Sequence, residues 1–304
     1  VVKMKNNNEI NHRQNSEEIL SYLFTQRKLY SISKKVVIYL FVLNLIFYFL
    51  GLSDSIQSNN RFKVIYVFWG LIFSILYIRE SNRINTAATM QELIDRKLYG
   101  FDVNTPFIKN SYLHQVVLNT KAKFPKEYEH QVSHNGKEGG VKDWYSDVSG
   151  LPLEKAIILC QIENCEWEIK LRKHFQILNI LLFILMIAIY VITYWNNSLE
   201  TLVIKLYPIL TIVADRLGYI YKNSNNISGS KSINDYLYQI YDDIERYDKE
   251  DIINNAKEIQ HCIYERRKNF APIPDAFYNL HREKYQNFSN QYIFDLKKKL
   301  QNLS

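Results

Sequence analysis

The most informative stretch of this chain for its fold is residues 151–195, "LPLEKAIILCQIENCEWEIKLRKHFQILNILLFILMIAIYVITYW". Its second part, Ile177–Trp195, is apolar except for Asn179 and Thr193. Such a run is long enough to cross the roughly 30 Å of hydrocarbon in a bilayer. No glycine or proline follows Pro152 within the stretch, which predicts one helix from Pro152 to Trp195, roughly 65 Å long at about 1.5 Å per residue. We expect this helix to leave the membrane and to continue outside it.

The first part of the same stretch carries a seam outside the predicted span. Spacings of four and three residues alternate along it, which is the rhythm of a helix that packs against another helix. The seam positions are Leu153, Ile157, Cys160, Asn164, Trp167, Leu171 and His174. We therefore expect this part of the helix to pack against other helices outside the membrane.

Two further runs, Val36–Leu52 and Phe62–Ile78, are similarly apolar and predict two more spans. A fourth span is expected from Leu199 to about Leu217, because only a short polar turn separates it from the third, although Lys205 and Pro208 make it less apolar. The remaining sequence has helical periodicity and no strand-like alternation of useful length. The sequence therefore predicts an all-α membrane protein: four transmembrane helices with long helical cytoplasmic extensions and a helical cytoplasmic domain.

Basic residues gather on one side of the predicted spans and indicate their orientation. They precede the first and third spans and follow the second and fourth, whereas the connectors at 53–60 and 196–198 carry none. By the positive-inside rule, both termini and the segment 79–175 are cytoplasmic. The net charge of +7 then reflects contact with lipid headgroups, and no nucleic acid polymer is expected as a partner. Nothing before residue 16 suits a signal peptide, so we expect the first span to be retained.

These features divide the chain into five segments. They are a cytoplasmic N-terminal helix at 1–33, a transmembrane hairpin at 34–79, a cytoplasmic helical region at 80–175, a second transmembrane hairpin at 176–222 and a cytoplasmic C-terminal helical region at 223–304. Within the last segment, "NSNNISGSKS" at 223–232 is rich in serine, asparagine and glycine. This composition predicts a linker before the C-terminal helices.

The sequence carries no constellation typical of an enzyme or a metalloprotein. It lacks the P-loop, G-x-S-x-G and H-E-x-x-H motifs, and its paired carboxylates suit solvated surfaces. The stretch that holds His130 and His134 contains glycines and predicts a loop, and Cys160 and Cys165 lack a second pair at zinc-finger spacing. We therefore expect no catalytic residue, no metal, no cofactor and, on the reducing cytoplasmic side, no disulfide.

Aromatic and basic residues interleave in two predicted cytoplasmic regions and form a candidate ligand-binding set. Aromatic rings stack on nucleobases, and guanidinium groups bind phosphates. The same side chains also suit a structural role, with tryptophans as core anchors and cations at the headgroups, and composition alone favours that interpretation. The candidates are Trp144, Tyr145, Trp167, Arg172, Arg266 and Arg267.

Several short motifs occur in a fixed order along the chain. They are Asp143, Trp144 and Tyr145, then Leu151, Pro152 and Leu153, then Cys160 and Gln161, then Trp167, and then Leu171 and Arg172, with "MQELIDRKLYGFDVN" at 90–104 and "PIPDAFYNLHREKYQ" at 272–286. Together they resemble the SMODS-associated four-transmembrane family of pore-forming effectors, over essentially the whole chain. Glu168, Ile157 and Ala276 depart from the family pattern, in which an Asp, a basic residue and a Trp are usual.

The resemblance implies a bacterial anti-phage effector that is encoded beside a nucleotide cyclase and spans the inner membrane several times. It also implies control by a cyclic or oligo-nucleotide second messenger and permeabilisation of the membrane by a homo-oligomer embedded in membrane lipids. The alternative is a non-conducting, membrane-anchored scaffold or sensor that binds a protein partner through its cytoplasmic helices. A triggered pore releases dye from liposomes, whereas a scaffold does not.

If the protein forms a pore, "YPILTIVADRLGYIYK", residues 207–222, places two charges where the fourth span ends. Arg216 is expected to extend to lipid phosphates, whereas the shorter Asp215 cannot reach as far. Adjacent helical residues point about 100° apart, so Asp215 and Arg216 are not expected to face each other. We predict that Asp215 faces the lumen near the cytoplasmic mouth. The pore-lining candidates are Asn44, Asn179, Lys205, Pro208 and Asp215.

Overall fold

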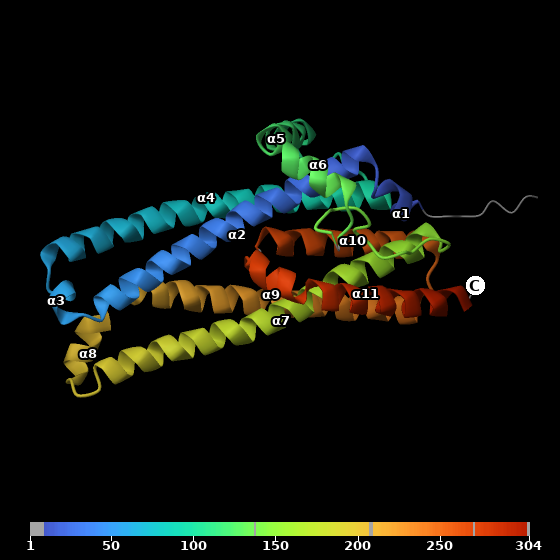
Figure 1. Ribbon diagram of the computed structural model, residues 1–304. Coiled ribbons are helices and arrows are strands. Elements are labelled where there is room, and N and C mark those ends of the chain that lie inside the picture. The colour runs from blue at the N-terminus through green and yellow to red at the C-terminus, as the bar shows by residue number, and fades with distance from the viewer. Residues whose placement is uncertain (1–8, 137, 207–208, 270, 303–304) are drawn as a thin grey trace, which may run out of the picture.

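The computed structural model describes residues 9–302 except 137, 207–208 and 270, and in this part the chain is an all-α membrane protein (Figure 1). The helices, in chain order, are α1 (Ile10–Arg13), α2 (Glu17–Gly51), α3 (Asp54–Gln57), α4 (Asn60–Tyr99), α5 (Asn110–Lys123), α6 (Pro125–Ser133), α7 (Leu153–Thr193), α8 (Leu199–Leu206), α9 (Leu210–Asp242), α10 (Lys249–Lys268) and α11 (Asp275–Asn302). Helices α2 and α4 form one long hairpin, and α7 and α9 form a second beside it (Figure 1).

The longest helix, α7, confirms that one helix crosses the membrane and continues beyond it. It covers 41 residues without interruption, and Pro152 stands at its N-cap position. Helices α2, α4 and α7 are each long and apolar enough to span a bilayer. Most side chains in their apolar halves are not buried within the single chain, as expected for surfaces that contact lipid.

The predicted fourth span is not one straight helix. The structure has α8 and α9 in its place, and residues 207–208, including the pore candidate Pro208, lie outside the described residues. Lys205, another pore candidate, pairs through Nζ with Asp54 of α3 at 2.6 Å, and its carbonyl accepts a hydrogen bond from Gln57. These contacts hold α8 against the connector of the first hairpin, at the end of the bundle (Figure 1). Within the described residues, α9 is not among the helices that are long and apolar enough by themselves to span a bilayer, so the fourth crossing stays a prediction.

The predicted linker at 223–232 is wrong, because α9 runs through it as a continuous helix from Leu210 to Asp242. Asn223 bonds to Arg172 and Gln176 of α7, and Asn226 bonds to the backbone between α10 and α11. These amides are buried and paired on one face of the helix. A composition that suits a loop in water thus forms a helix here because neighbouring helices supply hydrogen-bond partners.

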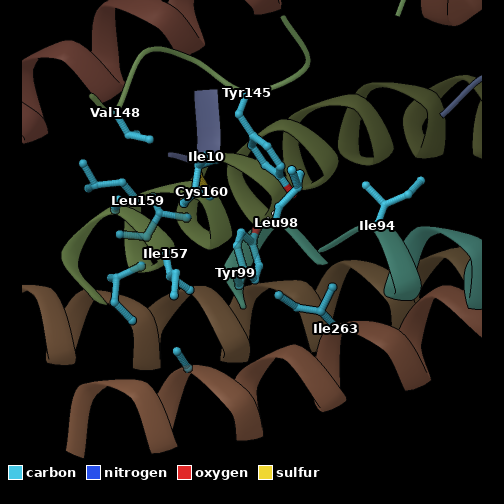
Figure 2. Packing of buried hydrophobic residues seen from close by; sticks show 14 of the residues in the cluster. Ile10, Ile94, Leu98, Tyr99, Tyr145, Val148, Ile157, Leu159, Cys160 and Ile263 are labelled. Carbon is cyan, nitrogen blue, oxygen red and sulfur yellow. Dashed lines mark hydrogen bonds between the residues drawn. The ribbon is translucent and has the colours of Figure 1, made fainter. Parts of the chain in front are cut away.

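The largest apolar core lies outside the membrane, where α4, α7 and α10 meet. Figure 2 shows this packing, which includes Ile94 and Leu98 from α4, Ile157 and Cys160 from α7, and Ile263 from α10. Ile157 and Cys160 are positions of the predicted seam and are fully buried. Farther along the seam, Trp167 and Leu171 pack in a second cluster with α11. The expectation that the seam packs against other helices is confirmed.

Candidate ligand-binding site

A cavity of about 950 Å³ lies between α2, α7, α11 and the loop that joins α6 to α7. Its size is within the range of sites for small ligands and cofactors. Among the described residues, eight basic side chains line it, compared with six acidic ones. The basic residues are Arg27, Lys28, Lys34, Lys35, Lys142, Arg172, Arg267 and Arg282, and the acidic residues are Glu127, Asp143, Asp147, Glu163, Glu168 and Asp275. The lining therefore carries an excess of positive charge.

Five of the six residues predicted from the sequence lie in the lining of this cavity, namely Trp144, Tyr145, Trp167, Arg172 and Arg267. They come from the loop before α7, from α7 itself and from α10, so the fold brings together regions that are far apart in the chain. Arg266 lies outside the lining, where its guanidinium bonds to Glu168 and to the Ser230 hydroxyl.

Tyr145 and Arg267 belong to a buried polar network behind the cavity wall. Arg267 pairs with Asp95 at 2.6 Å, and the Tyr145 hydroxyl donates to the same carboxylate at 2.8 Å. Burial raises the pKa of Tyr145 well above its usual value. Burial lowers the pKa of Arg267, but Asp95, Tyr145 and Tyr30 together outweigh burial and raise that pKa. These two side chains therefore fix the wall, and their polar atoms already have protein partners.

Arg172 joins three elements at the base of the cavity. Its guanidinium donates to Glu168 at 2.6 Å on α7, to Asn223 at 2.8 Å on α9 and to the Ala271 carbonyl at 3.1 Å before α11. Burial would raise the pKa of Glu168, but Arg266 and Arg172 lower it to about 2. Glu168 is therefore a carboxylate between two guanidinium groups. The cluster ties both helices of the second hairpin to the C-terminal region.

Aromatic rings stand beside the cations in the lining. The Trp167 ring centroid is 5.0 Å from that of Tyr278 and 5.8 Å from that of Tyr285, both on α11. Trp144 is partly buried and packs against the main core. The cavity thus combines flat rings, which stack on bases, with guanidinium and ammonium groups, which bind phosphates.

Sequence reasoning did not find the cationic wall that α2 contributes. It assigned Arg27, Lys28 and Lys34 to lipid headgroups, whereas the structure places them in the cavity lining. Lys28 pairs with Glu127 at 2.5 Å and Lys34 with Asp275 at 2.9 Å. One available signal was distance, because eight residues of helix, about 12 Å, separate Lys28 from the start of the apolar run at Val36. Arg282 of α11, also in the lining, had no such signal.

The polar residues of the apolar helices are paired within the single chain. Asn44 accepts a hydrogen bond from Trp69 Nε1 at 2.7 Å, and Asn179 Oδ1 accepts one from Arg216 Nη1 at 3.1 Å. Both asparagines are buried, whereas Asp215 is partly exposed. Whether any of these residues lines a pore stays a prediction.

Two expectations about the charges of α9 are wrong. Arg216 does not extend to the lipid phosphates but is buried, with its guanidinium 4.1 Å from the ring centroid of Phe41. Arg216 also pairs with its neighbour Asp215 at 2.7 Å, although adjacent side chains leave a helix in different directions. The long arginine side chain can fold back, and it finds an amide, a ring and a carboxylate inside the bundle.

Comparison with known proteins agrees with the motifs noted in the sequence. A family model described as "SMODS-associating 4TM effector domain" matches residues 8–295, which include both hairpins and all the described residues of the cavity lining. Over 227 residues the chain is 26% identical to a "Probable CBASS effector molecule" of Bacillus cereus (strain VD146), covering 71% of this chain and 72% of that protein. No solved structure matches the chain. The chain therefore belongs to the SMODS-associating 4TM effector family.

Proposed function

We propose that this protein is a pore-forming effector of a CBASS anti-phage system, controlled by a cyclic or oligo-nucleotide second messenger. In this proposal it spans the bacterial inner membrane with both termini in the cytoplasm and acts as a homo-oligomer that permeabilises the membrane. The family membership and the name of the Bacillus cereus relative support the role of effector. The concentration of basic residues beside the spans supports the orientation.

One observation carries the proposal of nucleotide control: the cationic, ring-lined cavity is built on the helices that enter the membrane. Arg27 and Lys34 lie on α2, and Trp167 and Arg172 lie on α7. A ligand that prefers one arrangement of these side chains shifts the population of arrangements of the same two helices inside the bilayer. No separate relay between the sensor and the membrane is required.

Dye release from liposomes tests the proposal against the non-conducting scaffold. The purified full-length chain is placed in liposomes loaded with a self-quenching dye, and a panel of cyclic di- and trinucleotides is added. We expect at least one nucleotide to change the rate of dye release. If a nucleotide binds and release stays at the rate of protein-free liposomes, the pore is contradicted and the scaffold is favoured.

Asp215→Asn tests the lining of the proposed pore. Within the described residues, Asp215 is the acidic candidate on α9, where it pairs with Arg216 and is partly exposed, and an acid at a pore mouth attracts cations. We expect the substitution to reduce cation-over-anion selectivity in single-channel recordings while the protein still inserts. Identical selectivity in the two proteins would assign the lumen to another helix. Glu200→Asn, exposed at the start of α8, is the matched control.

A further inference from the structure

Two arginines on different walls of the cavity approach the same loop. Arg27 of α2 donates through Nη1 to the carbonyls of Gly139 and Gly140, both at 2.8 Å. Arg282 of α11 lies against Gly136, where a Cβ atom would stand 3.0 Å from its Nη2. A Cβ at Gly140 would lie 1.7 Å from the His134 carbonyl oxygen, so this tight loop requires glycine there. The loop carbonyls therefore hold the Arg27 guanidinium in place, and the missing side chain at Gly136 leaves room for the Arg282 guanidinium.

The two guanidinium groups are close enough to influence each other and are not matched by an acid. Burial, and secondly the charge of Arg282, lower the pKa of Arg27. Within the described residues, no carboxylate forms an ion pair with either guanidinium. Asp275 does act on Arg27 electrostatically, but its carboxylate pairs with Lys34 at 2.9 Å. Like charges brought together without a counter-charge are costly in a folded chain unless an anion binds between them.

Two unpartnered hydrogen-bond acceptors belong to the lining of the same cavity. Gln26, next to Arg27 on α2, and Gln131 of α6 both line the cavity. The side-chain oxygen of each is buried and has no hydrogen-bond partner in the described part of the chain. Such an acceptor costs about 1–3 kcal/mol unless a donor reaches it. The cavity lining thus offers guanidinium donors suited to a phosphate and carbonyl acceptors suited to an amino or hydroxyl group.

We propose that Arg27 and Arg282 together bind one phosphate of the ligand, while Gln26 and Gln131 accept hydrogen bonds from an adjacent sugar hydroxyl or base amino group. This inference rests on the proposed function for the nature of the ligand and adds its orientation. A phosphate between the two guanidinium groups removes their repulsion and links α11 to α2, the first membrane-crossing helix. The ligand then acts as a bridge between the C-terminal helix and the membrane.

Titration with inorganic pyrophosphate tests the phosphate site independently of any nucleotide. Binding to the detergent-solubilised full-length chain is measured by calorimetry for the wild type, Arg27→Gln, Arg282→Gln and the control Lys284→Gln, an exposed position on α11. We expect each arginine variant to bind about tenfold or more weakly, the effect of losing a charge-assisted hydrogen bond, and the control to match the wild type. Wild-type binding that both variants retain within twofold would overturn the proposal, as would no binding to the wild type.

Folding effects are separated by the choice of variant. Arg27→Gln removes the donor to two loop carbonyls, so Arg27→Lys is included to restore charge there. Arg282, which has a ring contact with Tyr278 at 5.8 Å, carries the test if the Arg27 variants unfold early. The pyrophosphate titration is repeated in nanodiscs of phosphatidylcholine and of phosphatidylglycerol. Equal affinity in the two supports a soluble phosphate ligand, and a loss in phosphatidylglycerol would assign the site to lipid headgroups and overturn the proposal.

Dye release separates failure of this inference from failure of the proposed function. If no nucleotide changes dye release from wild-type liposomes, yet pyrophosphate binding depends on Arg27 and Arg282, the pore proposal fails and the phosphate site stands. If a nucleotide triggers release equally in the wild type and in Arg282→Gln, with equal half-maximal concentrations, the phosphate site is overturned and the pore proposal stands. A tenfold increase in that concentration for Arg282→Gln, but not for Lys284→Gln, supports both.

Discussion

The two helical hairpins are held together by different chemistry. In the first, α2 and α4 meet mainly through apolar and aromatic side chains, with polar pairs spaced well apart. Those pairs are Glu18 with Lys97, Gln26 with Gln91, Ser33 with Glu80, and Asn44 with Trp69. In the second, α7 and α9 are joined at short intervals by amides and guanidinium groups. Those contacts are Glu166 with Asn234, Arg172 with Asn223, Gln176 with Asn223 and with the Ile220 carbonyl, and Asn179 with Arg216.

The difference has a physical consequence for how each hairpin responds to change. Apolar contacts are non-directional, so the first hairpin can lose one side chain and still repack. Buried hydrogen bonds are directional, and removing one partner leaves the other unsatisfied in a medium of low dielectric constant. The second hairpin therefore has the more definite register and is the more sensitive to single substitutions.

The largest effect is expected from Arg172→Ala in the second hairpin. The variant removes the donor to Asn223 and to the Ala271 carbonyl and leaves Glu168 with Arg266 alone. Breaking a buried charge cluster in this way typically costs about 3–5 kcal/mol. We expect the Arg172→Ala variant to unfold in detergent at a lower temperature than the wild type, as measured by circular dichroism. The sequence alone predicts instead that the variant is expressed normally and responds more weakly to the nucleotide. Lys173→Ala, exposed on the same helix, is the control, and equal stability of the two variants would contradict this account.

The next effect is a pH dependence that arises from Glu168. Its pKa in the folded protein is lowered from 4.5 to about 2, so the ionised form favours folding. This stabilisation is fully present above about pH 4.5 and is lost as the pH falls towards about 2, with an upper limit of about 3 kcal/mol at about 1.36 kcal/mol per unit. Acid lowers the free energy of unfolding of the wild type, and Glu168→Gln should remove the part of this decrease that arises from Glu168. Denaturant unfolding of the wild type and of Glu168→Gln between pH 5 and pH 2 measures this difference. If the free energy of unfolding falls equally with pH in the two proteins, Glu168 is not the source of the pH dependence.

A smaller effect is expected for Asn226→Ala on α9. Asn226 accepts from the Ala271 N–H at 3.0 Å and donates to the Asn269 carbonyl at 3.3 Å, so its loss leaves two backbone groups between α10 and α11 without this partner. We expect a loss of about 2 kcal/mol. Asn225→Ala, exposed on the neighbouring position of the same helix, should cost less than about 0.5 kcal/mol. Equal costs at the two positions would show that the polar face of α9 contributes little.

The smallest effect belongs to the first hairpin. Trp69→Phe removes the donor to Asn44 but retains an aromatic ring against Phe47, whose centroid is 5.5 Å away. Hydrogen bonds between membrane helices contribute about 0.6 kcal/mol on average, so we expect about 1 kcal/mol or less. Trp195→Phe, at a side chain 75% exposed, serves as the control. A cost for Trp69→Phe as large as that for Arg172→Ala would remove the distinction between the hairpins.

The same distinction explains what could be predicted from the sequence. Helix α7 could be predicted because its apolar run and its lack of breakers are local properties, and the seam at Ile157 and Cys160 repeats at a helical period. The linker prediction failed because the partners that stabilise α9 at 223–232 lie on other elements, and local composition does not report them. Pro208 allows a bend in the predicted fourth span, but the position of α8 could not be predicted, since Lys205 pairs with Asp54 about 150 residues earlier in the chain.

The cavity could be predicted only in part. Trp144, Trp167 and Arg172 stand out because aromatic and basic residues are close together in that segment. Arg27 and Arg282 are separated by the length of the chain and come together only when α2 and α11 pack around the loop before α7. A basic residue near a membrane span also has an ordinary explanation in the headgroups, and charge alone does not distinguish the two roles.

Because α7 is one unbroken helix, a tilt of its cytoplasmic half also tilts its membrane half. Counted from Leu153, Arg172 is the twentieth of 41 residues. Its contacts with neighbouring helices therefore hold α7 at the midpoint of its length. Each half is about 30 Å long at about 1.5 Å per residue. A tilt of about 10° about that point moves either end by roughly 5 Å, close to one helical turn of about 5.4 Å. The displacement of the membrane end for a given tilt then depends on how firmly the hydrogen bonds of Arg172 fix the middle of the helix.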